Sequence, residues 1–127
     1  YYFLSNFWGP PGPRQTVEHW YQASKASTKE EQDWVLDSPS AAIAKKRGKK
    51  VQLRSDWEQI KIGVMRNLLQ WKFSNPELRR LLLATGEAEL IEGNWWKDTF
   101  WGVCKGVGQN WLGRLLMELR SNLKEAK

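Results

Sequence analysis

The chain has 127 residues, 41% hydrophobic and 27% charged, which is the balance of a folded globular protein rather than a disordered one. Twenty Lys and Arg residues against fourteen acids give a formal net charge of +6, which favours anionic partners such as nucleic acid, nucleotides or phosphorylated metabolites. The single cysteine, Cys104, excludes an internal disulfide, and a single histidine, His19, argues against a zinc site.

No apolar run reaches membrane-spanning length and no secretory signal is visible, so we expect a cytoplasmic protein without a membrane partner. The length suits one domain, and we predict that residues 1–127 form it. The chain begins with Tyr1 rather than methionine, which leaves open whether further residues precede it.

The first eight residues, Tyr1–Trp8, are rich in aromatic side chains and have the composition of a strand. The segment Gly9–Pro13 contains three prolines, forbids regular structure and predicts a stiff bend.

Helices are predicted wherever a capping residue precedes a run with helical spacing of apolar residues. Two starts also carry the Ser/Thr-x-x-Glu pattern of a capping box, Thr28 with Glu31 and Ser55 with Glu58. The expected helices follow caps at Thr16, Thr28, Ser38, Ser55, Asn75 and Asn110, and end near Ser27, Asp37, Gly48, Phe73, Gly86 and Leu123.

Apolar spacing also predicts which helix faces are buried. The expected core positions are Trp57, Ile60, Val64, Leu68, Trp71, Leu78, Leu81, Leu82, Leu112, Leu115, Leu116, Leu119 and Leu123. Residues 89–109 form the only clearly non-helical region between helices. The expected fold is a predominantly helical α+β single domain with a few short strands, at the start and near this region.

The segment from Glu92 to Gly113 holds four tryptophans and five glycines. Glycines let the backbone turn tightly, aromatic faces stack on ring-bearing ligands, and a loop that enters a helix offers free N–H groups to a phosphate. A tryptophan-lined hairpin that merely covers a small core explains the same composition, and this segment alone does not decide between the two.

Five basic residues surround the expected end of the third helix, at 45–47 and 49–50. Such a run usually forms a solvated face with favourable charge at a helix C-terminus. Contact with a phosphate is the alternative interpretation.

The first helix carries the best candidate chemistry. Its residues Glu18, Gln22 and Lys25 are spaced i, i+4 and i+7 and share one face, which Tyr21 borders. The alternative is a solvated face with a weak charged pair. No nucleophile elbow, phosphate-binding P-loop or dinucleotide-binding turn occurs in the sequence.

Six segments in order resemble the motifs of the NADAR (YbiA-like) family, and together they cover nearly the whole chain. They begin with Phe3-Leu-Ser-Asn-Phe7 and Val17-Glu-His-Trp-Tyr-Gln-Ala-Ser-Lys25. The others are Ser38-Pro39 with the helix to Gly48, Val64-Met-Arg with Lys72-Phe73, Leu78–Thr85, and Asp98-Thr-Phe-Trp-Gly102 with Gly108–Arg120.

The resemblance implies an N-glycosidase that acts on ribosyl bonds. One branch of the family removes ADP-ribose from guanine in nucleic acid, and another hydrolyses phosphoribosyl-amino intermediates of riboflavin biosynthesis. The segment after Trp101 is closer to the ADP-ribose-directed and phage-type members, which implies a role in phage defence and pairing with a DNA ADP-ribosyltransferase. A non-catalytic module that binds ADP-ribose or nucleic acid is the alternative of another class.

By the same resemblance the catalytic residues are Glu18, Lys25 and Asp98, and no metal or cofactor is implied. Lys25 would displace the base and hold the sugar as a Schiff base, while the two acids handle protons and positive charge. The expected substrate-binding residues are Asn6, Tyr21, Gln22, Trp101, Gly102 and Asn110. His19 lies off the Glu18 face and is expected to be structural, and Cys104 to be incidental.

Overall fold

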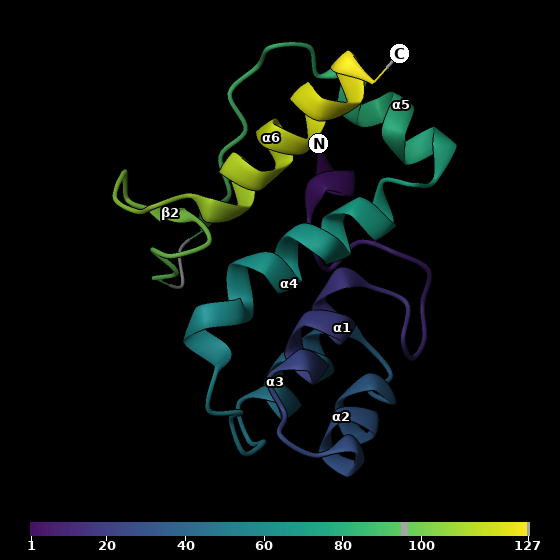
Figure 1. The fold of residues 1–127 in the computed structure, drawn as a ribbon, viewed down its shortest axis with the longest axis vertical. Coiled ribbons are helices and arrows are strands. Elements are labelled where there is room, and N and C mark those ends of the chain that lie inside the picture. The colour runs from purple at the N-terminus through teal and green to yellow at the C-terminus, as the bar shows by residue number, and fades with distance from the viewer. Residues whose placement is uncertain (95–96, 127) are drawn as a thin grey trace. The chain divides into compact units, whose positions relative to one another are not determined.

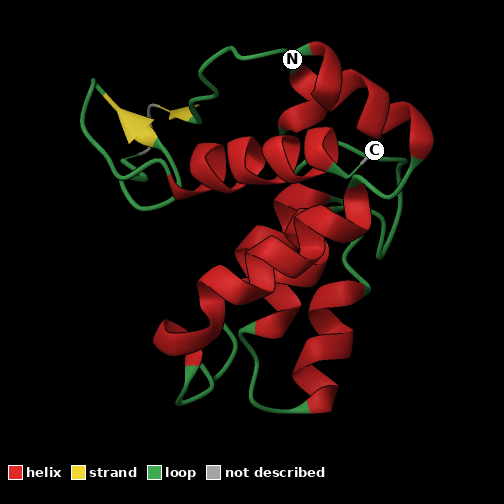
Figure 2. Ribbon diagram, turned by 45° about the horizontal axis from the view of Figure 1, so that its top comes forward, coloured by secondary structure: helices red, strands yellow, loops and turns green. Residues whose placement is uncertain are grey.

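The computed structural model describes residues 1–94 and 97–126 (Figure 1). Helices dominate this part of the chain and its sheet has two short parallel strands (Figure 2), which confirms the mostly helical α+β fold class. Trp95 and Trp96 of the tryptophan-rich segment lie outside the described residues. The elements are η1 (Tyr2–Leu4), α1 (Val17–Ser24), α2 (Lys29–Leu36), α3 (Ala41–Gly48), α4 (Trp57–Lys72), α5 (Pro76–Ala84), β1 (Gly93–Asn94), β2 (Val103–Cys104) and α6 (Trp111–Glu125).

Contacts divide the chain into two compact units, Tyr1–Leu68 and Leu69–Lys127, and the single domain over 1–127 stays a prediction. In the first unit α1 packs against α2 and α3, which also contact each other. The centre of this packing is a small apolar cluster of Ala23, Val35, Leu36 and Ala44, with Trp20 and Val51 against it.

The expected strand at the start of the chain is wrong. Residues Tyr2–Leu4 form a short 3₁₀ helix, closed by local hydrogen bonds from Leu4 N to Tyr1 O and from Ser5 N to Tyr2 O. A strand needs a neighbour to pair with, whereas these backbone groups bond within their own turn.

Three of the six predicted helix starts are confirmed by side-chain caps. The hydroxyls of Thr16 and Thr28 and the carboxamide of Asn75 accept backbone N–H groups of the first turns of α1, α2 and α5. The third start is wrong: Ser40, not Ser38, caps α3, and its hydroxyl accepts from Ile43 N.

Neither predicted capping box is completed by its glutamate. Glu31 accepts a hydrogen bond from Gln52 N at 3.1 Å, so its carboxylate ties α2 to the segment before α4. Glu58 instead accepts from the Lys61 ammonium at 2.9 Å. Both glutamates find partners outside the turn that the sequence pattern assigned to them.

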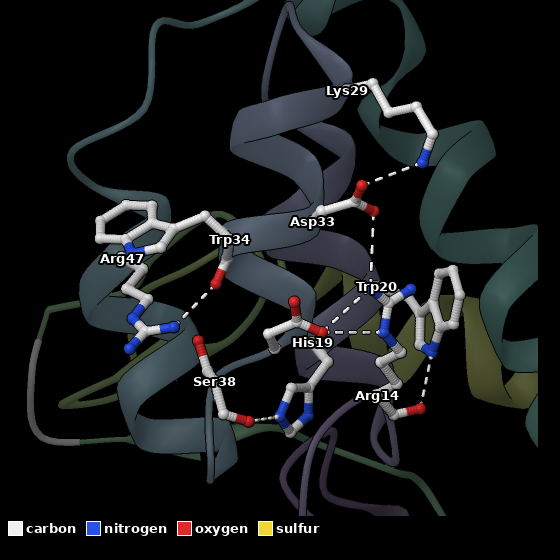
Figure 3. A network of polar contacts seen from close by, with 9 residues as sticks. Arg14, His19, Trp20, Lys29, Asp33, Trp34, Ser38 and Arg47 are labelled. Atoms are coloured by element: carbon white, nitrogen blue, oxygen red, sulfur yellow. Dashed lines mark hydrogen bonds and ion pairs between the residues drawn. The ribbon is translucent and has the colours of Figure 1, made fainter.

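A polar network joins α1 to α2 and to the segment after it (Figure 3). Arg14 forms ion pairs with Asp33 and Asp37, and its carbonyl accepts the indole N–H of Trp20 at 2.9 Å. His19 is fully buried and bonds through Nδ1 to the Thr16 hydroxyl and through Nε2 to the Ser38 carbonyl, both at 2.9 Å. With both ring nitrogens engaged, His19 has the structural role expected for it.

The buried line of α4 differs from the predicted one. Trp57 is buried as expected, but Trp71 is 50% exposed. The buried positions further along the helix are Met65, Leu69 and Phe73, spaced i, i+4 and i+8. Two adjacent apolar lines run along this helix, and spacing alone does not select the buried one.

In the second unit α5 packs against α6, and the non-helical segment between them carries β1 and β2. Gly86 follows α5 in the left-handed region (φ 65°), as its predicted role of terminator requires. The predicted inward face of α6 is confirmed at Leu112, Leu115, Leu116 and Leu119. None of the described helices combines the length and apolar character needed to cross a membrane.

Candidate active site

Helix α1 places Glu18, Gln22 and Lys25 on one face, as their spacing predicts. The cap at Thr16 fixes where the helix begins, and the Glu18 N–H donates to the Asn6 carbonyl at 3.0 Å. Glu18 therefore stands in the first turn, where the partial positive charge of the helix N-terminus favours a carboxylate.

Glu18 and Gln22 are both buried, with 6% and 4% of their surfaces exposed. The Gln22 amide donates to Glu18 Oε2 at 2.6 Å, and a buried carboxylate needs such donors. Helix α3 leaves room for this pair because its last residue is Gly48, where a Cβ would overlap the Gln22 side chain. The close approach of α3 thus packs the Gln22 amide against Glu18.

Lys25 is held at both its backbone and its side chain. Its carbonyl accepts a hydrogen bond from Arg54 N at 2.8 Å, which ties the end of α1 to the segment that leads into α4. Its ammonium lies 5.4 Å from the centre of the Tyr21 ring, and that ring packs at 5.2 Å against Trp57. Aromatic surface therefore lines one side of the amine.

Burial lowers the pKa of the Lys25 amine below its usual value. The Glu18 carboxylate opposes this effect, while the ammonium groups of Lys45, Lys49 and Lys61 add to it. A lowered pKa increases the neutral fraction of the amine at neutral pH, and the neutral amine is the nucleophilic form.

Asn6 lies next to the beginning of α1 and is 9% exposed. Besides the carbonyl bond to Glu18, its side-chain amide contacts Met65 Sδ at 3.6 Å. Its Oδ1 and the Oε1 of Gln22 are buried without a hydrogen-bond partner among the described residues. Buried acceptors are usually satisfied, so two such atoms beside Glu18 suit a site that receives a polar ligand.

In the second unit, Asp98 organises the turn that precedes Trp101. Its Oδ1 accepts the backbone N–H groups of Phe100 and Trp101 at 3.1 and 2.9 Å. The Asn94 side chain makes two hydrogen bonds to the backbone of Asp98. Its amide donates to the Asp98 carbonyl, and its Oδ1 accepts the Asp98 N–H. This carboxylate therefore shapes the loop before Trp101.

Gly102 and Asn110 lie close together in the loop between β1 and α6. A side chain at Gly102 would overlap the Glu92 carbonyl, so only glycine fits there. Asn110 has φ 53° and its N–H donates to the Gly102 carbonyl at 3.3 Å.

Asn110 is the N-cap residue of α6, as expected, but its side chain makes no capping hydrogen bond. Its carboxamide instead accepts from Glu92 N and donates to Leu90 O, both at 2.9 Å, and so joins the start of α6 to the segment before β1. The left-handed backbone of Asn110 turns its side chain toward that segment instead of the first turn of α6.

Trp101 is half-buried and meets the Phe100 ring edge-on, at 4.8 Å between centroids and 86° between planes. Phe100 in turn stacks on Trp111 at 6.4 Å. The indole therefore belongs to a small aromatic group, and its partial exposure is compatible with stacking on a ligand ring.

The structure thus brings five of the predicted site residues together in the first unit and four in the second. The first set is Asn6, Glu18, Tyr21, Gln22 and Lys25; the second is Asp98, Trp101, Gly102 and Asn110. Among the residues that the structure describes, no three His, Cys, Asp or Glu side chains are grouped as a metal site requires.

Lys72 was not singled out by the sequence reasoning. It is 7% exposed at the end of α4, and its ammonium lies 5.3 Å from the Phe73 ring centre. Burial lowers the pKa of this amine to about 8, against the opposing charge of Glu92. In the sequence Lys72 stood out only through the Lys72-Phe73 pair of the family motifs, because spacing alone does not show that it lies on the buried line of Met65 and Leu69.

Comparison with known proteins identifies relatives along almost the whole chain. N-glycosidase YbiA of Escherichia coli (strain K12) is 42% identical over 112 residues, which are 85% of this chain and 69% of that protein. A riboflavin biosynthesis protein of Vibrio vulnificus (strain YJ016) is 43% identical over 134 residues, 97% of this chain but 36% of that protein.

The fold is also similar to a solved structure. The NMR structure of E. coli YbiA superimposes with a TM-score of 0.84 at 38% sequence identity, covering 97% of this chain and 78% of that one. Residues 1–124 match the NADAR domain. The resemblance read from the six motifs is therefore confirmed, and the chain belongs to the NADAR family.

Proposed function

We propose that the chain is an N-glycosidase that cleaves the bond between C1 of a ribose and the nitrogen of a base, with Lys25 as nucleophile and Glu18 as proton-transfer group. Relatives named N-glycosidases confirm the broader expectation of an enzyme that hydrolyses N-glycosyl bonds. The observation that carries the mechanism is the face of α1, where a buried carboxylate and an amine of lowered pKa stand two turns apart.

The reaction proceeds through an imine. When C1 of the ribose is attached to an exocyclic amine, the ring C1–O4 bond breaks, O4 takes the proton of that amine, and a C1=N imine results. Neutral Lys25 then adds to C1. The base then leaves as the free amine, taking a proton, and the sugar is held on Lys25 as a Schiff base. Water adds to this second imine, which releases the sugar aldehyde and restores the lysine.

Each step moves a proton, and Glu18 is the group placed to move it. Its carboxylate accepts the proton that the Lys25 nitrogen loses after adding to C1 and passes this proton to the departing base. The carboxylate then removes a proton from the attacking water. The Gln22 amide keeps the carboxylate oriented through its 2.6 Å hydrogen bond. Asp98 stays a prediction as the second acid.

As substrate we propose guanine bases of nucleic acid that carry ADP-ribose. The net charge of +6 favours a polyanion, and the half-buried indole of Trp101 offers a surface for a ring. This assignment makes a DNA ADP-ribosyltransferase the functional partner, because such an enzyme creates the bond that this one removes. The role in phage defence and the cytoplasmic location are part of the same proposal.

A second substrate class has an observation of its own in its favour. The relative from Vibrio vulnificus is named a riboflavin biosynthesis protein, and its matched part spans 97% of this chain. The second candidate is therefore a phosphoribosyl-amino pyrimidine, cleaved by the same chemistry. A module that only binds ADP-ribose or nucleic acid is the third candidate, and measured turnover of either substrate would exclude it.

The test compares both substrates with one set of variants. Wild type, Lys25→Arg and Glu18→Gln are incubated with a guanine-ADP-ribosylated oligonucleotide and with a phosphoribosyl-amino pyrimidine, with borohydride added to trap imines. Lys46→Arg is the control for Lys25→Arg, because Lys46 is exposed on α3 and has no part in the mechanism.

We expect wild type to release ADP-ribose from the oligonucleotide and to be trapped by borohydride on Lys25. Lys25→Arg keeps the positive charge but abolishes trapping, and Glu18→Gln lowers kcat by about 10²–10⁴-fold. Normal turnover by Lys25→Arg would refute the Schiff base. Turnover of the phosphoribosyl-amino pyrimidine alone would identify it as the substrate in place of ADP-ribosylated guanine. Binding of the oligonucleotide without release of ADP-ribose would support the non-catalytic binding module.

A further inference from the structure

Three basic side chains converge on the site from elements other than α1. The C-terminal end of α3 lies against the Gln22 face, because Gly48 contacts the Gln22 side chain. Lys45 and Lys49 flank that contact, one turn apart on the same end of the helix. Lys61 belongs to α4, whose first residue, Trp57, packs against the ring of Tyr21.

The basic run on α3 does not act as one surface. Arg47 is turned toward α2, where it donates to the Trp34 carbonyl at 2.8 Å and lies 5.1 Å from the centre of the Trp34 ring (Figure 3). Lys46 and Lys50 are exposed. Lys45 points the other way, and its ammonium lies 5.9 Å from the Phe7 ring.

That contact places Lys45 beside the candidate ligand residue Asn6, the neighbour of Phe7 in the chain. Asn6 is bonded through its carbonyl to Glu18 N, and its Oδ1 is one of the two buried acceptors without a described partner. The ring that Lys45 contacts therefore belongs to the residue next to the one that bonds the first turn of α1.

We propose that Lys45, Lys49 and Lys61 form a phosphate-binding site beside Lys25, and that this site holds the 5′-phosphate or diphosphate of the ribosyl substrate. The inference rests on the proposed N-glycosidase function and specifies how its substrate is held. Both candidate substrates carry phosphate at that end of the ribose, so one site serves either.

Electrostatics supports this assignment. The ammonium groups of Lys45, Lys49 and Lys61 each act on the Lys25 amine, while Glu18 is the acid that opposes them there. Like charges gathered around a partly buried amine repel one another, and a dianion among them offsets that repulsion. A phosphate also accepts several hydrogen bonds, which lysines supply as mobile point charges.

The competing explanation is that the basic run only stabilises the C-terminus of α3 through the helix dipole. That role does not distinguish Lys45 and Lys49 from Lys46 and Lys50, since all four stand in or next to the last turn. The double variants Lys45→Ala/Lys49→Ala and Lys46→Ala/Lys50→Ala each remove two positive charges. Comparing them therefore distinguishes a phosphate site from a general stabilisation of the α3 C-terminus.

The experiment titrates ribose 5-phosphate, and ribose as its uncharged counterpart, into the protein and follows binding by NMR. We expect Lys45→Ala/Lys49→Ala to weaken ribose 5-phosphate binding by at least about tenfold, the size of one charge-assisted hydrogen bond. Lys46→Ala/Lys50→Ala should bind as wild type does. Lys49→Gln, a single neutral change at an exposed position, should weaken ribose 5-phosphate binding in the same direction with little effect on folding.

Equal weakening by both pairs, or by neither, would overturn the phosphate site. The binding of ribose 5-phosphate is measured without turnover, so the phosphate site can fail or hold independently of the proposed N-glycosidase activity. Phosphate binding that needs Lys45 and Lys49, in a protein that cleaves neither substrate, would keep the site and reject the enzyme. Cleavage that is indifferent to the Lys45→Ala/Lys49→Ala pair would keep the enzyme and reject the site.

Discussion

At the scale of single residues, Gly48 and Gln22 determine how the Glu18 carboxylate is held. Gln22 reaches Glu18 because α3 presents no side chain at its last position, and a Cβ there would overlap Gln22 Oε1. The carboxylate thus depends on a residue that is distant in sequence and contributes only space. Such a contact is set by tertiary packing rather than by local sequence.

Gly48→Ala adds only one methyl group, but it should lower both the activity and the stability of the protein. The displaced Gln22 side chain loses its bond to Glu18, and we expect a fall in kcat of at least about tenfold and a destabilisation of about 1–3 kcal/mol. The matched control is Gly63→Ala, because nothing lies within 4 Å of a Cβ at that helical position. This control should gain about 0.5–1 kcal/mol from helix propensity. Equal effects in urea unfolding would contradict the packing argument.

Lys72 gives a prediction with a defined pH window. Its pKa is about 8 in the folded chain and about 10.5 when unfolded, so between these values the unfolded chain binds more protons and stability rises with pH. Relative to Lys72→Met, wild type should gain about 2 kcal/mol between about pH 7 and 9.5, at about 1.4 kcal/mol per pKa unit. Urea unfolding of both proteins at the two pH values measures this. A difference that is constant with pH would show that the amine is not desolvated.

At the scale of elements, the position of α1 depends on its first turn. The Thr16 hydroxyl accepts the His19 N–H and also bonds the His19 ring, which in turn bonds the Ser38 carbonyl. The cap is therefore part of a buried chain that fixes α1 against the segment after α2. Thr28 caps α2 with one such bond at an exposed position.

The two caps should differ in what they contribute. Thr16→Ala should cost about 2 kcal/mol, because the buried His19 ring loses a partner together with the helix N-terminus. Thr28→Ala should cost about 0.5–1 kcal/mol, the usual value of an exposed cap. Thermal unfolding of the two variants provides the comparison. Equal losses would show that the bond to the His19 ring adds nothing.

The helices were predictable because their signals are local. Caps such as Asn75 and Thr16 lie a few residues from the groups that they bind, and the spacing of Glu18, Gln22 and Lys25 follows from helix geometry alone. The predictions fail where a group bonds a partner far along the chain, or where a segment of strand-like composition bonds within its own turn. Glu31 bonds Gln52, and the first residues close a 3₁₀ turn where composition indicated a strand.

The same distinction holds for the candidate site. A helical spacing identifies Glu18 and Lys25 as neighbours, but not that Gly48 packs on Gln22 or that Lys45 and Lys49 act on Lys25. The Gly48 contact and these electrostatic effects both depend on the packing of α3 against α1. The resemblance to the family supplied candidate residues that spacing could not, including Trp101 and Asn110.

At the scale of the whole molecule, the net charge of +6 makes the salt dependence of substrate binding a test between the two proposed substrates. A nucleic acid releases counterions when basic residues bind its phosphates, so its affinity falls as salt rises, with a slope of about −0.7 per phosphate contacted on a single strand. A small phosphorylated substrate carries too few charges for a steep slope.

We expect the KM for a guanine-ADP-ribosylated oligonucleotide to rise several-fold more between 50 and 300 mM NaCl than the KM for ADP-ribosylated guanosine. The guanosine adduct is the matched control because it presents the same bond to Lys25 and Glu18. Parallel curves would mean that the positive charge serves only the phosphates next to the scissile ribose, and would favour the phosphoribosyl-amino pyrimidine over nucleic acid.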